Sequence, residues 1–184
     1  DGITWTIQTN PVDNDWTCVC YSSDLSLFVA ISNTGTNNRV MTSLDGITWT
    51  SRTSAADNNW TSICWAYNLN LFVAVANSGT NNRIMTSSNG TSWTSRTSPA
   101  DNNWTSIIWI PDLYIFAACA SSGTNRLMYS LDGNTWNLLA TPSNNSWNCI
   151  YWDYIKSKLI LIGPGGTNNI NVSNIFKPNS NNSL

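Results

Sequence analysis

The carboxylates of this sequence that could do acid–base chemistry recur at a fixed spacing. Asp13, Asp57 and Asp101 are 44 residues apart. Two Asp side chains could in principle serve as the carboxylate pair of a glycosidase. An active site, however, brings different groups together at one point, whereas these three occupy equivalent places in a repeat. The chain also has no Glu and no His, so we expect it not to be an enzyme.

The cysteines do not form a metal-binding or disulfide pattern. There are five of them, an odd number without a CxxC pair: Cys18, Cys20, Cys64, Cys119 and Cys149. A zinc site would need further ligands, and the chain has no His to supply them. Four lie in apolar runs typical of strands, and Cys149 follows Trp147 in another. We therefore expect no metal or cofactor, and reduced thiols that pack as small buried hydrophobes.

The composition argues against charged partners. Only 10% of the residues are charged and the net charge is −2, so no basic surface is available for nucleic acid or anionic lipid. No apolar run approaches the ~20 residues of a membrane helix, and we expect no membrane insertion. Polar groups come mainly from Ser, Thr and Asn, which suit hydrogen bonding to sugars or to protein backbone.

The tryptophans reveal an internal repeat. All eleven, together with one Tyr, fall into three columns in which successive members are 44 or 43 residues apart. The columns are Trp5, Trp49, Trp93 and Trp136; Trp16, Trp60, Trp104 and Trp147; and Tyr21, Trp65, Trp109 and Trp152. The step falls to 43 where "GTNNR" becomes "GTNR" at 123–126, which indicates a loop tip. A period of this length is typical of repeat architectures.

Each unit contains four short runs with strand composition. In the second unit they are 60–66, 71–76, 83–87 and 92–97, separated by segments rich in Asn, Gly, Ser and Asp. No stretch has the apolar spacing of a helix. We predict an all-β fold, a β-propeller of four-stranded antiparallel blades, with a β-sandwich as the alternative. The propeller would occupy 1–178 as a single domain, followed by a polar C-terminal tail at 179–184.

The two ends of the sequence are incomplete in complementary ways. The last unit has three strand-like runs, at 147–153, 158–163 and 170–173, whereas the start of the chain resembles an isolated fourth strand. We expect residues 3–8 to pair beside 170–173 and to close a ring of four blades, which would cover a free sheet edge. The alternative is that the units form an arc of a larger ring of five to eight blades.

The turn before each fourth strand carries a recognisable motif. It reads "SLDGITW" at 43–49, "SSNGTSW" at 87–93 and "SLDGNTW" at 130–136. These segments resemble the Asp-box of sialidase-like and BNR-repeat propellers, with one residue fewer between Asp and Gly. The whole repeat also resembles uncharacterised propeller proteins of bacteriophages and large DNA viruses. The predicted structural turn residues are Ser43, Asp45, Gly46, Trp49, Asn89, Gly90, Trp93, Asp132, Gly133 and Trp136.

The resemblance implies a fold without implying sialidase activity. By resemblance that chemistry needs a Tyr activated by Glu and three Arg around one carboxylate, but this chain has no Glu. Its Arg39, Arg83 and Arg126 form one repeat column, which propeller symmetry would distribute around the ring. In the Asp-box itself, Asp45 is expected to accept backbone N–H bonds, Gly46 to adopt a positive φ, and Trp49 to anchor the next strand.

A partner would bind where loops gather on one face of the propeller. The candidate binding residues are Asp57, Asn58, Asn59, Asn81, Asn82, Arg83, Asp101, Asn102, Asn103 and Arg126. One interpretation is structural: Asp57 and Arg83, or their copies in other units, pair while the Asn side chains cap turns. The other is a set of shallow sites, one per blade, for a sugar or a protein.

Two functions follow from these patterns. We favour a non-catalytic structural or interaction module that binds other protein subunits of an assembly. The alternative is a lectin-like adhesin for glycans. The viral resemblance implies a virion or an extracellular surface as the setting, and the thiols favour assembly in a reducing compartment.

Overall fold

The structure, a computed structural model, describes residues 3–141, 143–164 and 170–173. Within these ranges it contains fifteen strands and no helix, which confirms the all-β prediction. No helix that could cross a bilayer occurs in the described part of the chain. The predicted tail at 179–184 lies outside the described residues.

The strands form four antiparallel sheets in chain order. The first sheet contains β1 (Trp16–Ser22), β2 (Leu27–Ser32), β3 (Val40–Ser43) and β4 (Thr50–Arg52). The second contains β5 (Trp60–Ala66), β6 (Leu71–Ala76), β7 (Ile84–Ser87) and β8 (Thr94–Arg96). The third contains β9 (Trp104–Ile110), β10 (Ile115–Ala120), β11 (Leu127–Ser130) and β12 (Asn137–Leu139). The fourth contains β13 (Cys149–Asp153), β14 (Lys158–Ile162) and β15 (Ile170–Val172).

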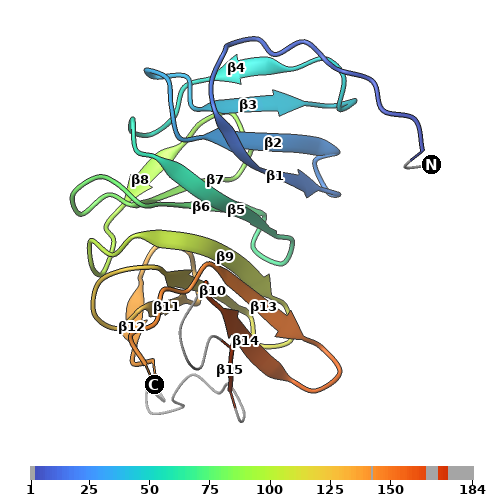
Figure 1. Cartoon of the computed structure of the whole chain (residues 1–184). Helices are drawn as coiled ribbons and strands as arrows, with labels where there is room; N and C mark the ends of the chain where they lie inside the picture. Colours follow the sequence, from blue (N-terminus) through green and yellow to red (C-terminus); the bar gives the residue numbers. More distant parts are fainter. Residues whose placement is uncertain (1–2, 142, 165–169, 174–184) are drawn as a thin grey trace.

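The sheets stack face to face, the first at the top and the fourth at the bottom of Figure 1. The first strands of neighbouring sheets, β1, β5, β9 and β13, contact one another in succession. Strands such as β6 and β10 are buried along nearly their whole length, because neighbouring sheets cover both of their faces. This explains why their sequences are apolar without alternation.

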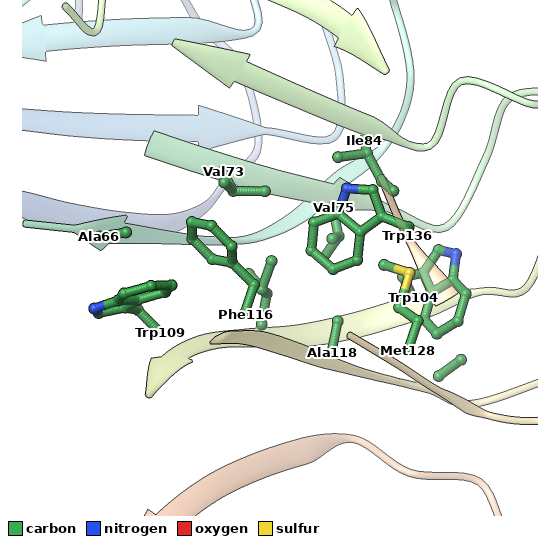
Figure 2. Close-up of a cluster of buried hydrophobic side chains, with 12 residues drawn as sticks. Ala66, Val73, Val75, Ile84, Trp104, Trp109, Phe116, Ala118, Met128 and Trp136 are labelled. Atoms are coloured by element: carbon green, nitrogen blue, oxygen red, sulfur yellow. The ribbon is translucent and has the colours of Figure 1, made fainter. Parts of the chain in front are cut away.

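Large side chains fill the space between sheets from the inner to the outer strand. Figure 2 shows the cluster between the second and third sheets, which includes Trp104, Trp109, Phe116 and Trp136. Phe116 lies 4.7 Å from Trp109 and 6.1 Å from Trp136, measured between ring centroids. The Trp60 column is fully buried in the second, third and fourth sheets, as its recurrence in strands predicts.

A β-bulge in the inner strands of the first three sheets also bonds each of these sheets to the next. The ladder shifts register around Thr17, Thr61 and Thr105. Each threonine Oγ1 then donates to a Trp carbonyl of the next sheet: Thr17 to Trp60 O at 2.8 Å, Thr61 to Trp104 O at 2.8 Å, and Thr105 to Trp147 O at 2.6 Å. A bulge re-aims one side chain out of the ladder, and here it aims a hydroxyl at the neighbouring sheet.

The predicted closure by the N-terminal strand is wrong for this structure. Residues 3–8 form no strand, the fourth sheet has only three strands among the described residues, and Trp5 is 87% exposed. In Figure 1 the N-terminal segment passes above β4 before it enters β1, whereas β15 lies at the opposite end of the stack. Side chains such as Trp104, Phe116 and Trp136 fill the space between neighbouring sheets, and the first and fourth sheets lie at opposite ends of the stack.

Candidate functional site

The turns before the fourth strands are held by the predicted side chains. In the first sheet Asp45 Oδ1 accepts the N–H groups of Ile47 and Thr48 at 2.8 and 2.7 Å, and Gly46 has φ +73°. The indole N–H of Trp49 donates to Gly46 O at 3.2 Å. Asn89 and Asp132 make the corresponding bonds in the next two sheets. The hydrogen bonds of Asp45 and the positive φ of Gly46 are those expected for the turn.

The turn hydrogen bonds also change the acidity of the two carboxyls. At Asp45, the N–H groups of Thr48 and Ile47 and the hydroxyl of Ser43 lower the pKa from 3.8 to about 2. At Asp132, partial burial alone would raise the pKa, but the N–H groups of Thr135 and Asn134 outweigh it, so the pKa is lowered. Both groups are therefore anionic acceptors at neutral pH.

The opposite end of the sheets, here called the loop end, carries the segments between sheets and the loops between second and third strands. There Asp57 Oδ1 accepts the N–H of Asn37 at 2.7 Å and lies 3.9 Å from Arg39 Nε. The predicted pairing of Asp57 with Arg83 is therefore wrong. Arg83 lies 3.6 Å from Asp101, because each Asp follows the fourth strand of one sheet and reaches back to the loop of that same sheet.

The Asn residues of the same segments reach forward to the next sheet. Asn58 Nδ2 donates to the carbonyl and the side-chain oxygens of Asn82, at 2.8 and 3.1 Å. Asn102 Nδ2 likewise donates to Thr124 O at 2.9 Å. Both Asn58 and Asn102 are buried. Successive residues, Asp57 then Asn58, thus tie the connecting segment to the sheet behind and the sheet ahead.

The arginines complete this network. Arg83 donates from Nη1 to Asn77 O and Asn102 O, both at 3.0 Å, and to Asn103 Oδ1 at 3.1 Å. Arg39 makes the same kind of contact with Asn59 Oδ1 at 3.0 Å. Arg126 donates within its own loop, to Gly123 O and Ser121 O. Most of the predicted binding residues are thereby bonded to one another, and Asn59, Asn81 and the Asp side chains remain at the surface.

A different surface gathers aromatic side chains. At the turn end, where the inner strands β1, β5, β9 and β13 finish, the structure has a hollow of about 440 Å³. Seven aromatic residues line it, from all four sheets: Tyr21, Trp65, Tyr67, Trp109, Tyr151, Trp152 and Tyr154. We call it the aromatic hollow.

The sequence analysis used the Trp columns only to find the repeat, and it therefore missed the aromatic hollow. Hydrogen bonds between sheets hold three of the indoles there. Trp65 Nε1 donates to Asp24 Oδ2 at 3.0 Å, and Trp152 Nε1 donates to Asp112 Oδ2 at 3.2 Å. Trp109 donates to Asn68 in the same way. The signal was present in the tyrosines that follow this Trp column, such as Tyr67 and Tyr154, because turn positions face solvent.

Exposed apolar side chains divide unevenly between the two ends. The large exposed hydrophobic residues of the described sheets include Leu25, Tyr67, Leu69, Tyr114, Tyr154 and Ile155 in the turns after the inner strands, and Leu44, Ile47 and Leu131 in the turns before the fourth strands. Within the described ranges, no large hydrophobic residue is exposed in the loop-end segments. The surface suited to an apolar partner is the turn end.

Three of the five thiols have suppressed acidity. Burial raises the pKa of Cys20 to about 11 and that of Cys119 to about 12, and it raises the pKa of Cys64 well above its ordinary value. All five cysteines are free, but of the predicted buried thiols only Cys119 is buried; Cys18, Cys20 and Cys64 are partly buried and Cys149 is exposed. Among the described residues, no group of His, Cys, Asp or Glu is arranged to hold a metal ion.

Comparison with known structures shows which fold the chain resembles. No protein-family model and no curated protein matches the sequence. A nidogen/laminin complex aligns with TM-score 0.63 and 14% identity, covering 82% of this chain and 57% of the other. A streptogramin B lyase aligns with TM-score 0.64 and 13% identity, covering 87% and 54%. The computationally designed protein Ika4 aligns with TM-score 0.64 and 13% identity, covering 95% and 100%.

These likenesses show the fold and its extent. The chain spans a little over half the length of the first two structures. Together with sheets of antiparallel strands stacked in chain order, they define a protein with a β-propeller-type fold, as the repeat predicts.

Proposed function

We propose that this chain is a non-catalytic interaction module that docks a protein partner in the aromatic hollow. The observation that carries the proposal is the difference in surface chemistry between the two ends of the sheets. At the loop end, the Asp, Asn and Arg side chains are engaged with one another. At the turn end, aromatic rings line a hollow with exposed aliphatic residues around it.

The chemistry of the hollow favours a protein over a sugar. Aromatic anchors surrounded by apolar contacts are the usual centre of a protein interface. Aliphatic neighbours such as Leu25, Leu69 and Ile155 add area for an apolar partner, but they offer no ring for a sugar to stack upon. The interaction module favoured from the sequence is retained, while its binding surface moves from the loop end to the turn end.

The turn bonds support kinship with Asp-box repeats. Ser43, Asp45, Gly46 and Trp49 form one closed set of hydrogen bonds, which is the structural role expected of that motif. A docking module built from such repeats would suit a virion or another surface assembly, the setting that the sequence resemblance implies.

Displayed peptides test the docking proposal. We expect peptides selected on the immobilised chain to be rich in apolar residues and to bind Tyr67→Ser about 5- to 30-fold more weakly, the range for a lost anchor. Tyr114→Ser is the matched control: Tyr67 and Tyr114 are 50% and 57% exposed, but only Tyr67 lines the hollow. Ser23 and Ser26 occupy the same two columns in the first repeat, so both changes suit the turn.

A glycan array run in parallel separates the alternatives. Glycan binding that is lost in Tyr67→Ser, without peptide binding, would favour the lectin-like adhesin. Peptide binding equally weakened by Tyr67→Ser and Tyr114→Ser, or absent from the wild-type chain, would refute docking in the hollow.

A further inference from the structure

The outward face of the first sheet exposes residues that the internal interfaces bury. Val19 is 59% exposed, whereas its equivalents in the second, third and fourth sheets are 3–5% exposed: Ile63, Ile107 and Ile150. Tyr21 is 47% exposed, whereas its equivalents Trp109 and Trp152 are buried and Trp65 is partly buried. This face has the composition of one half of an interface between sheets.

The far face of the fourth sheet is the other half. Ile170 is 65% exposed, whereas its equivalents in the preceding sheets are at most 7% exposed: Val40, Ile84 and Leu127. Ile162 is 45% exposed, and its equivalents Ile31, Val75 and Cys119 are fully buried. The stack therefore presents opposite halves of one repeated interface at its two ends.

The positions that form hydrogen bonds across the internal interfaces have equivalents on the two free faces of the stack. Inside the stack, Ser62 Oγ accepts the N–H of Ile107 at 3.1 Å, and Ser106 Oγ accepts that of Ile150 at 3.4 Å. The equivalent positions at the free ends are Cys149, which is exposed, and Val19. Cys149 would thus face Val19 if the fourth sheet of one chain packed on the first sheet of another.

One hydrogen bond of the internal interfaces has no counterpart at the free ends, because both its donor and its acceptor are replaced there. Inside the stack, a Trp indole donates to an Asp or Asn in the turn of the preceding sheet, as Trp65 does to Asp24. At the free ends, Tyr21 takes the place of the Trp and Ile155 takes the place of the acceptor. The polar partner is lost together with the indole donor, so this junction leaves no indole unpaired.

The strand missing from the fourth sheet is matched by the N-terminal segment. Residues 3–8 repeat the sequence of a fourth strand, and Ile3, Trp5 and Ile7 are all more than 80% exposed. This segment passes above β4 in Figure 1, at the top of the stack. A sheet packed on the first sheet would have its outer edge there, and the edge strand β15 pairs with β14 on one side and has no strand on its other side among the described residues.

We propose that a second copy of this chain packs against both ends, so that two copies close an eight-bladed ring. The fourth sheet of each copy lies on the first sheet of the other, and residues 3–8 of each copy form a fourth strand beside β15 of the other. Such a head-to-tail contact gives a ring when the rotation closes. Propellers have typically four to eight blades, so two copies complete the ring and a third would exceed that range.

The mass of the 184-residue chain in solution is the first test. We expect light scattering after size exclusion to give twice the 20.3 kDa of one chain. Val19→Lys and Ile162→Lys, which place a charge in the two half-interfaces, should each give the single-chain mass. Leu131→Lys, in an exposed turn of the third sheet, is the control and should leave the dimer intact. A single-chain mass for the wild-type protein overturns the proposal.

A disulfide cross-link tests the pairing itself. Val19→Cys should form a disulfide with Cys149 of the second copy when an oxidant removes one hydrogen from each thiol, and Cys149→Ser should abolish it. A closed ring has two such junctions, so the non-reducing gel should show a dimer and no larger species. A ladder of higher multimers, or a cross-link that survives Cys149→Ser, contradicts the closed ring. These outcomes are independent of peptide binding at Tyr67.

Discussion

Replacing Asn58 by Ala tests whether the repeated Asn side chains at the loop end hold the sheets together. Asn58 is 6% exposed and donates two hydrogen bonds, to Asn82 O and Asn82 Oδ1. It also fills the space beside Gly79 that a Cβ there would occupy. The Ala variant therefore loses both bonds and leaves a gap.

The expected loss of stability follows from those contacts. Two hydrogen bonds contribute about 0.5–1.5 kcal/mol each, so the free energy of unfolding should fall by about 2 kcal/mol. For a chain of this size that corresponds to a fall in Tm of about 4 to 8 °C. Urea unfolding and a thermal scan, both followed by Trp fluorescence, measure the two quantities.

Asn59→Ala is the matched control for Asn58→Ala. Asn59 is exposed and accepts one hydrogen bond, from Arg39 Nη1 at 3.0 Å, so its loss should cost less than about 1 kcal/mol. If Asn58→Ala lowers the free energy of unfolding no more than Asn59→Ala does, the Asn58 hydrogen bonds do not hold the sheets together. If it keeps full stability but loses peptide or glycan binding, the loop-end interpretation as a binding site is right.

Three further perturbations test other parts of the structure. Because the folded pKa of Asp45 is about 2 and its ordinary value is 3.8, ionised Asp45 stabilises the fold above about pH 4 and this contribution is lost as pH falls to about 2. Asp45→Asn keeps an acceptor oxygen, so its Tm should fall less than that of wild type between pH 5 and pH 2; parallel curves would contradict this. Burial raises the pKa of Cys119 to about 12, so a thiol reagent at pH 8 should spare Cys119 until the protein unfolds, and labelling of Cys119 in the folded protein would show that it is accessible. Gly123 has φ +92°, and a Cβ there would overlap Asn102, so Gly123→Ala should lower the free energy of unfolding by more than about 1 kcal/mol in urea, and an unchanged midpoint would refute the described loop.

The features that the sequence predicted well depend on near neighbours in the chain. The inner and second strands of the second repeat, 60–66 and 71–76, have the predicted bounds. The turn bonds of Asp45 also form as predicted, since all their partners lie within three residues. By contrast, the sequence did not predict the bulge at Thr61. The hydrogen bond that the bulge allows goes to the carbonyl of Trp104, 43 residues away in the next sheet.

The sequence alone determined the all-β class, the repeat and its phase, the turn chemistry and the incomplete units at the two ends. Tertiary structure decided which Asp meets which Arg, where the aromatic rings gather, and that the N-terminal segment lies far from β15. Strand alternation and turn bonds depend on residues a few positions apart, so a repeat displays them directly. The rotation between sheets is the combined result of many packed side chains, among them Trp104, Phe116 and Trp136, and no single position in the sequence records it.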